Sequence, residues 1–364
     1  MAQIAIERVS KSFKANSVLN DVSLSAETGE IVVVFGPSGA GKTVLLRLIA
    51  GVEDLDAGTI TLLGKDVTDA PPEARGLGMA FQNFALFPHM SAYENIASAL
   101  TAGPASKSEI QAKVDGVAKL LKIGHVMQHA PRELSNGQKQ RTALARALVS
   151  DPRILLLDDP LRNVDAKLRY EMRMELPSLL KTSASTVLYV TQDYKEAMAL
   201  GDRIAVLLEG KIAQVATPGL IYREPASLGV ARLFGDPTIN LVPATPSLEN
   251  GAPTFGVGGA PIALPPSYSH AAGRACVIGV RPEAIVVTEA PALGGFPVEV
   301  VAVTPLNEKS VLLLRTRDGR ELLASESGEG ELPRRHGPAN ASFDRDAILV
   351  FDAASGLRIA PQTN

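Results

Sequence analysis

The sequence predicts an α/β domain built on a largely parallel sheet, followed by a smaller all-β domain. Three continuous apolar runs, at residues 30–35, 153–157 and 186–191, have the length and composition of strands that are buried on both faces of such a sheet. Segments with the apolar spacing of helices lie between these runs. With 364 residues, the chain is long enough for two domains.

Helices are expected in three segments of the first domain. Apolar residues recur at helical spacing in residues 107–123, 136–149 and 166–180. Proline lacks the backbone N–H that a helix interior needs, so Pro177 is expected to kink or end the last of these helices. The recurrence of strand, helix and strand indicates a single α/β domain over residues 1–235.

The remainder of the chain has a different composition. Prolines gather between residues 243 and 266 in a passage that resembles a linker. Short β-like runs follow at residues 275–280, 298–303 and 310–315. These features predict a small β-barrel or sandwich over residues 236–364.

The overall composition narrows the class of protein. The 36 basic and 39 acidic residues give a net charge of -3, which leaves no electrostatic basis for bulk nucleic-acid binding. The single cysteine, Cys276, excludes an internal disulfide framework and suits a reducing compartment. No apolar run approaches the roughly 20 residues that span a bilayer, and residues 1–7 lack the features of a signal peptide, so we expect a cytoplasmic protein.

The strongest chemical motif is a glycine-rich loop directly after the first buried strand. It consists of Gly36, Pro37, Ser38, Gly39, Ala40, Gly41, Lys42 and Thr43, and Val44 continues it into an apolar helical run. This spacing matches the P-loop, in which backbone N–H groups and a helix start face the phosphates of a nucleotide. Lys42 would reach the outer phosphates, and Thr43 would offer a hydroxyl to Mg²⁺. A structural glycine-rich turn is the alternative, and a P-loop alone also fits kinases and GTPases.

A second motif indicates which nucleotide-binding family is involved. Leu134 precedes the segment Ser135, Asn136, Gly137 and Gln138, which stands at the start of a predicted helix. This segment closely resembles the signature sequence of ABC ATPases, with Asn136 where the commonest form has glycine. The resemblance implies that ATP is sandwiched in a head-to-tail dimer, where this helix end faces the terminal phosphate held by the opposite subunit. Ser135 and Gln138 also fit a capping box, and the two interpretations are compatible.

Further segments resemble the remaining motifs of the same family. The apolar run 154–157 and Asp158 look like the Walker B strand, whose aspartate would hold Mg²⁺, and residues 161–165 look like the D-loop. Gln82 stands in a segment that resembles the Q-loop, which in the family contacts both Mg²⁺ and the transmembrane partner. Phe13 would stack on adenine, although an aromatic residue taken alone is more often part of a core.

Two residues depart from the family pattern at positions that the resemblance assigns to catalysis. Asp159 stands where a glutamate normally follows the Walker B aspartate, so its carboxylate is one methylene nearer to the backbone. Gln192 stands where a switch histidine is expected, and glutamine cannot become cationic. Together with Gln82, these residues are the predicted catalytic positions. Because a displacement of about 1 Å can cost about a hundredfold in rate, we expect slow hydrolysis at this chain's own site.

The carboxy-terminal half narrows the subfamily. Residues 279–283, Gly-Val-Arg-Pro-Glu, resemble the Arg-Pro-Glu element of the regulatory OB-like (TOBE) domain in maltose-type carbohydrate importer ATPases. Residues 233–241 resemble that family's junction between its two domains, and residues 87–90 resemble its Q-loop continuation. The resemblance implies an α/β P-loop ATPase with a helical subdomain at about 85–150, which powers uptake of a sugar, polyol or glycerol-phosphate-like solute.

The resemblance also implies partners. They are two transmembrane permease subunits, an extracellular or periplasmic solute-binding protein and, because of Asp159 and Gln192, a second and intact ABC ATPase rather than a second copy of this chain. The chain would lie at the cytoplasmic face of the inner membrane. Three alternatives remain: a homodimer that hydrolyses ATP slowly, a subunit that binds ATP only for regulation, and a non-transport ABC ATPase of DNA repair or translation. The last usually carries paired cassettes or long coiled-coil insertions, and the acidic net charge disfavours it.

Overall fold

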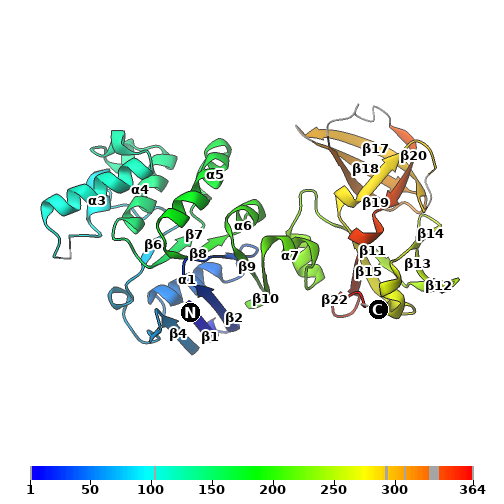
Figure 1. The fold of residues 1–364 in the computed structure, drawn as a ribbon, viewed down its shortest axis with the longest axis horizontal. Helices are drawn as coiled ribbons and strands as arrows, with labels where there is room; N and C mark the ends of the chain where they lie inside the picture. The colour runs from blue at the N-terminus through cyan, green and yellow to red at the C-terminus, as the bar shows by residue number, and fades with distance from the viewer. Residues whose placement is uncertain (1, 102–103, 292–293, 307–308, 328–335, 363–364) are drawn as a thin grey trace. The chain divides into compact units, whose positions relative to one another are not determined.

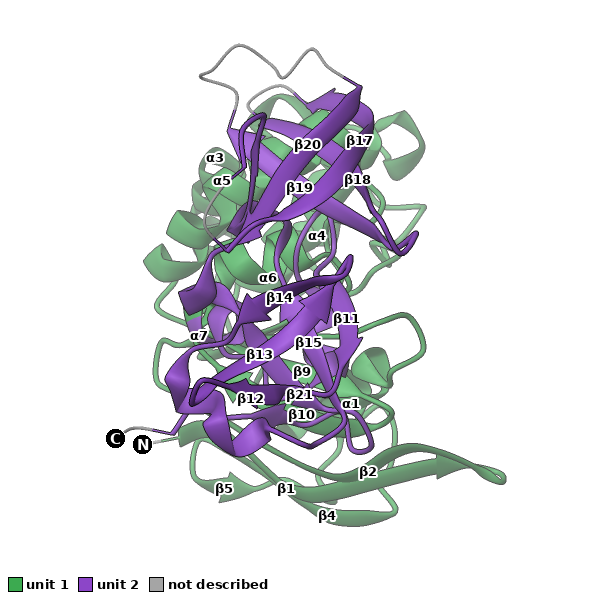
Figure 2. Cartoon of the chain, turned by 90° about the vertical axis from the view of Figure 1, so that its right-hand side faces the viewer, with its two compact units in different colours: residues 1–219 green, residues 220–364 purple. Residues whose placement is uncertain are grey.

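The chain forms two compact units. A computed structural model describes residues 2–101, 104–291, 294–306, 309–327 and 336–362. The units are Met1–Gly219 and Leu220–Asn364, coloured green and purple in Figure 2. The expected boundary was 235/236, whereas the structure groups residues 220–235 with the second unit. The physical reason is backbone pairing, since Ser227 forms an antiparallel bridge with Leu357 near the end of the chain.

A six-stranded sheet forms the centre of the first unit (Figure 1), in the order β10-β9-β3-β8-β7-β6. The strands are β3 (Ile31–Phe35), β6 (Gly78–Ala80), β7 (Ile154–Asp158), β8 (Thr186–Thr191), β9 (Arg203–Leu208) and β10 (Lys211–Ala216). All neighbours are parallel except β9 and β10. Every residue of β3, β7 and β8 is buried, which confirms the prediction of central parallel strands.

A second, antiparallel sheet of the first unit has the order β2-β1-β4-β5. Its strands are β1 (Ala2–Phe13), β2 (Asn16–Glu27), β4 (Ala57–Leu62) and β5 (Lys65–Asp66). Helix α1 (Lys42–Ala50) shares one hydrophobic core with both sheets, in which Leu46 packs with residues such as Ile6 and Leu156. The glycine-rich loop therefore leads from a fully buried strand into a helix that is buried in the same core.

The remaining helices of the first unit are α2 (Ala92–Ala97), α3 (Lys107–Leu120), α4 (Asn136–Leu148), α5 (Ala166–Thr182) and α6 (Tyr194–Leu200). Capping boxes start α2, α3 and α4, so the backbone N–H groups of the N-cap and N3 residues have side-chain partners. Pro177 does not end α5, which runs on to Thr182. Leu176 and Leu180 are buried on either side of the proline, and this packing offsets the hydrogen bond that proline cannot donate.

The described residues of the second unit form three antiparallel sheets, in the orders β11-β15-β21-β22, β12-β13-β14 and β16-β20-β17-β18-β19. The strands are β11 (Asn240–Ala244), β12 (Ser247–Glu249), β13 (Ala252–Val257), β14 (Ala260–Ala263), β15 (Cys276–Val280), β16 (Ile285–Thr288), β17 (Phe296–Leu306), β18 (Lys309–Thr316), β19 (Glu321–Ser327), β20 (Gly337–Phe343), β21 (Leu349–Asp352) and β22 (Arg358–Ile359). Helix α8 (Leu228–Leu233) lies in this unit, and α7 (Pro218–Arg223) spans the division. The strands predicted at 275–280, 298–303 and 310–315 correspond to β15, β17 and β18.

Within the described residues, no helix is both long and apolar enough to traverse a bilayer.

The carboxy-terminal end of α1 is closed by a buried arginine. Arg75 is 5% exposed, and its guanidinium donates to the carbonyl oxygens of Leu48 (2.8 Å), Ile49 (2.9 Å), Ala70 (2.9 Å) and Thr68 (3.1 Å). The last carbonyls of a helix have no partner within the helix, so a cation at this position satisfies them and complements the helix dipole.

We expect Arg75→Met to destabilise the first unit by about 3 kcal/mol, because these carbonyl oxygens lose the buried, charged donor that Arg75 supplies, and of the four Leu48 keeps a backbone donor, the N–H of Gly51. Urea unfolding followed by circular dichroism measures the change. Lys65→Met, on an exposed residue of β5, is the control and should leave the unfolding midpoint in place. Equal midpoints for Arg75→Met and the unmodified chain would contradict the capping role.

Candidate nucleotide-binding site

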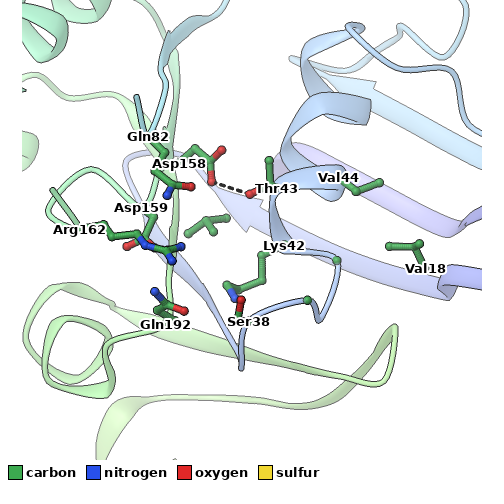
Figure 3. A pocket seen from close by; sticks show the side chains of 13 residues that line it. Val18, Ser38, Lys42, Thr43, Val44, Gln82, Asp158, Asp159, Arg162 and Gln192 are labelled. Atoms are coloured by element: carbon green, nitrogen blue, oxygen red, sulfur yellow. Dashed lines mark hydrogen bonds and ion pairs between the residues drawn. The ribbon is translucent and has the colours of Figure 1, made fainter. Parts of the chain in front are cut away.

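One pocket of the first unit brings together motifs from distant parts of the sequence (Figure 3). Its volume is about 190 Å³, and it lies where the carboxyl ends of β3, β7 and β8 meet, which is where open α/β sheets bind ligands. The residues that line it are Val18, Ser38, Gly39, Gly41, Lys42, Thr43, Val44, Gln82, Asp158, Asp159, Arg162, Val190 and Gln192.

The glycine-rich loop can curl only because of its glycines. Gly41 has φ +100°, and a Cβ atom there would lie 2.8 Å from Leu19. A Cβ atom at Gly36 would lie 2.3 Å from the carbonyl oxygen of Leu207. Lys42 Nζ donates to the carbonyl oxygens of Gly36 and Pro37, both at 2.8 Å. Burial lowers the pKa of Lys42, while Asp159 and Asp158 raise it. The ammonium group of Lys42 is thus held by the loop backbone and feels the charges of the Asp158 and Asp159 carboxylates.

Side-chain oxygen atoms that can ligate a metal ion lie in the same pocket as Lys42. Thr43 Oγ1 donates to Asp158 Oδ1 at 3.0 Å, and Gln82 lines the same pocket. Burial raises the pKa of Asp158, and the hydrogen bond from Thr43 opposes that shift. Hydroxyl, carboxylate and amide oxygens are ligands that suit Mg²⁺. Among the described residues, no group of three or more His, Cys, Asp or Glu side chains is placed to hold a metal ion.

Asp159 is held on a strained turn. It has φ +44°, its backbone N–H donates to the carbonyl oxygen of Val190 at 2.8 Å, and it is 6% exposed. Burial raises the pKa of Asp159 to about 6, and the charges of Arg162 and Lys42 oppose the rise. Gln192 follows β8 and faces the same pocket. The structure therefore brings together both residues that depart from the expected catalytic pair.

Comparisons with known proteins identify the family. The chain matches the ABC transporter family over residues 19–162 and the TOBE domain family over residues 278–351. It is 40% identical over 359 residues to the sn-glycerol-3-phosphate import ATP-binding protein UgpC of Cereibacter sphaeroides, covering 99% of this chain and 100% of that protein. The chain belongs to the ABC transporter ATP-binding subunits. This finding confirms the predicted family, with its carboxy-terminal TOBE domain.

Other relatives agree. The protein of the same name from Yersinia pseudotuberculosis is 38% identical over 362 residues, covering 99% of this chain and all of that protein. The dimeric structure of a post-hydrolysis state of the ATP-binding cassette MJ0796, bound to ADP and Pi, is 28% identical with a TM-score of 0.54, and it covers 59% of this chain and 98% of that chain. The predicted fold, an ABC ATPase domain followed by a TOBE domain, is thereby confirmed, as is the class of ATPase coupled to transport.

The ABC signature segment does not line the pocket. Ser135 and Asn136 are exposed at the start of α4. Ser135 Oγ accepts from the backbone N–H of Gln138 at 3.3 Å, and Gln138 Oε1 accepts from the backbone N–H of Ser135 at 2.9 Å, so the capping box is formed. A Cβ atom at Gly137 would lie 2.1 Å from the terminal Cδ2 atom of Leu168, whose side chain would have to move. The helix start is left open on its outer side.

Other predicted nucleotide contacts also lie outside the cavity lining. Phe13, Gly36, Pro37 and Ala40 are absent from the residues that line it. Phe13 is 41% exposed, with Lys11 Nζ 5.2 Å from its ring centre, so it is not a core residue. Val18, which the sequence did not indicate, lines the pocket instead.

Two residues that sequence reasoning missed hold the Q-loop in place. Arg146 of α4 donates to the carbonyl oxygens of Ala85 (2.8 Å) and Phe84 (3.2 Å). Asn163 of the D-loop donates to the carbonyl oxygen of Gln82 at 2.8 Å. Helix α4 and the D-loop are therefore physically linked to the backbone that carries Gln82.

A buried carboxyl group supports the turn that carries Gln192. Glu196 is 1% exposed and accepts hydrogen bonds from Tyr189 (2.9 Å) and Thr191 (2.8 Å), and Thr191 in turn accepts from the backbone N–H of Asp193 (3.0 Å). Burial raises the pKa of Glu196 from 4.5 to about 7, against the two hydrogen bonds, which lower it. The folded state therefore favours protonated Glu196. The contribution of Glu196 to the free energy of unfolding is fully present below about pH 4.5 and is lost as the pH rises through about 7.

Glutamine cannot ionise. When the pH is raised from about 5 to about 8, we therefore expect the free energy of unfolding to fall less for Glu196→Gln than for the unmodified chain. The two decreases should differ by at most about 3 kcal/mol. The free energy of unfolding in urea, measured at a series of pH values, provides the comparison. The control is Glu171→Gln, on an exposed residue of α5. Parallel pH profiles for Glu196→Gln and the unmodified chain would show that Glu196 does not titrate in this range.

Proposed function

We propose that this chain is the ATP-binding subunit of an importer for a sugar, polyol or glycerol-phosphate-like solute, at the cytoplasmic face of the inner membrane. The observation that carries the proposal is the single pocket that unites the P-loop, the Walker B aspartate, Gln82 and the switch position. The full-length similarity to relatives named as sn-glycerol-3-phosphate import subunits supports the solute class. ATP-driven closure of two ATP-binding subunits would move two permease subunits, and a solute-binding protein would select the solute.

Each residue of the pocket has a role in this proposal. The N–H groups of the loop from Gly36 to Val44 bind the phosphates, and Lys42 faces the outer ones. Thr43, Asp158 and Gln82 would hold Mg²⁺, which when bound neutralises charge on the phosphates. Val18 contributes an apolar surface at the other end of the pocket, and Phe13, which is exposed, is available to stack on adenine.

We further propose that this site retains ATP and hydrolyses it slowly. The carboxylate of Asp159 is one methylene shorter than that of glutamate, and its backbone is fixed by the bond to the carbonyl oxygen of Val190. A general base must lie within about 3 Å of the proton it takes, directly or through one water. Gln192 donates a hydrogen bond but supplies no positive charge.

The exposed start of α4 supports a second site shared with another ATPase. Ser135, Gly137 and Gln138 would cover the phosphates held by the P-loop of the other subunit, as the family's head-to-tail dimer requires. We propose that the other subunit is a related ATPase that has the glutamate and histidine missing from this chain, because the dimer then retains one site that hydrolyses ATP normally. The alternative is a homodimer, and the MJ0796 cassette was solved as a dimer.

Size-exclusion chromatography with ATP tests the composition of this dimer. The chain alone should remain monomeric, and it should dimerise when an intact ATPase encoded beside it is added. A stable dimer of this chain alone, unaffected by any such relative, would favour the homodimer.

A non-transport ABC ATPase fits the structure less well. Such proteins usually carry long coiled-coil insertions, whereas the longest helix among the described residues is α5, with 17 residues. Three relatives that match along their full length are import subunits by name.

Uptake by living cells tests the transport function. In a strain that lacks the gene, we expect the loss of uptake of one solute among radiolabelled glycerol, sn-glycerol 3-phosphate and maltose, with the others unaffected. The unmodified gene should restore uptake, and a Lys42→Ala gene should not. Unchanged uptake of every sugar and polyol tested would refute the proposal.

A further inference from the structure

Arg162 is a charged residue of the pocket lining that lies in the D-loop segment and to which the family resemblance assigns no role. It follows Asp159 by three positions, and its backbone N–H donates to the Asp159 carbonyl oxygen at 3.2 Å, which fixes where its side chain begins. Figure 3 shows its guanidinium directed into the pocket, beside Asp159 and Gln192. Its charge is near enough to oppose the protonation of Lys42. Two cations therefore face the same small space.

The guanidinium is held loosely. Its Nη1 atom lies 3.7 Å from Asp159 Oδ2, which is an ion pair but is beyond hydrogen-bond distance, and its side chain is 45% exposed. Arg169, in the following helix α5, differs because it donates to the carbonyl oxygens of Leu161, Arg162 and Val164 at 3.1–3.2 Å. Arg169 therefore shapes the backbone of the D-loop, whereas the N–H donors of Arg162 face a cavity with room for a ligand.

The chemistry of the pocket indicates what Arg162 would bind. A guanidinium presents donors in a planar fork that matches two oxygens of a phosphate, and it stays charged at every physiological pH. Lys42 already uses two of its three N–H donors on the loop carbonyls, so it has limited capacity for phosphate. Arg162 stands at the end of the pocket with Asp159 and Gln192, the residues expected at the terminal phosphate. It supplies there the positive charge that Gln192 lacks.

We propose that Arg162 contacts the terminal phosphate of ATP and makes this site prefer ATP over ADP. This inference rests on the proposed nucleotide-binding function. ADP lacks the phosphate in question, so it gains nothing from Arg162. A site with this contact retains ATP even where hydrolysis is slow, because the outermost phosphate is bound by Arg162 as well as by the P-loop.

Equilibrium dialysis of the purified full chain with radiolabelled ATP and ADP, in Mg²⁺, tests the inference. Arg162→Ala should weaken ATP binding about tenfold to a hundredfold and change ADP binding less than about twofold. Arg162→Lys, which keeps the charge but not the fork, should lie between these values. Arg153→Ala, on an exposed residue before the opposite end of β7, is the matched control and should change neither affinity.

The outcomes separate the inference from the proposed function. If the unmodified chain binds neither nucleotide, both fail. If it binds ATP and the Arg162 variants weaken ATP and ADP equally, or weaken neither, only the inference fails. Should Arg162→Ala not fold, Arg162→Gln and Arg162→Lys decide the result, since both keep a polar side chain and differ in charge.

Discussion

The double variant Asp159→Glu, Gln192→His is expected to hydrolyse ATP at least about a hundredfold faster than the unmodified chain. Glutamate extends the carboxylate by one methylene from a backbone that is fixed by its bond to the carbonyl oxygen of Val190. Histidine adds a group that can be cationic near neutral pH. Both positions line the same pocket, so the two changes act on one reaction centre and each alone should recover less than their combination.

Steady-state release of phosphate by the purified chain, at saturating Mg²⁺ and ATP, measures this gain. Asp151→Glu serves as the matched control, because Asp151 is exposed and pairs with Lys113 away from the pocket. The control should hydrolyse ATP at the rate of the unmodified chain. A double variant no faster than that rate would show that Asp159 and Gln192 do not limit hydrolysis.

The second large effect is expected from Lys42→Ala, which should weaken ATP binding by about a hundredfold or more. Lys42 lines the pocket and is 8% exposed, and its Nζ atom donates to the carbonyl oxygens of Gly36 and Pro37. The substitution removes a charge-assisted contact with phosphate, worth about 1.5–3 kcal/mol, and also the internal support of the loop.

Equilibrium dialysis with ATP measures this loss, and circular dichroism confirms that the variant is folded. Lys65→Ala, on the exposed strand β5, provides the comparison. Affinity within about threefold of the unmodified chain would mean that the phosphates do not lie against Lys42.

The sequence predicted the central strands and the P-loop because each is a contiguous pattern. A run of apolar residues identifies a strand buried on both faces, and glycine spacing identifies a phosphate loop. The pocket that joins Lys42, Asp158 and Gln192 follows from these motifs, because the carboxyl ends of parallel strands meet at one edge of a sheet.

Residues that act through tertiary contacts were not predictable in this way. Arg75 caps α1 from 26 and 27 positions away, and nothing in its local sequence marks it as buried. Arg162 lies in the D-loop segment, where a charged residue ordinarily suggests solvent exposure. Because proline cannot donate a helix hydrogen bond, Pro177 predicted a kink or an end in its helix. The helix continues past it, since the buried packing of Leu176 and Leu180 outweighs that loss.

The fate of ATP bound to this chain alone tests the account most directly. The purified chain, in excess over γ-labelled ATP and with Mg²⁺, is quenched in acid at intervals and the label is separated into ATP and phosphate. We expect the ATP to be bound and about half of it to remain intact after several seconds, because a hundredfold loss from a turnover of about 10 s⁻¹ leaves about 0.1 s⁻¹. An ordinary enzyme with a turnover of about 10 s⁻¹ would convert it within a second. Conversion within a second, or failure to bind ATP, would contradict the account.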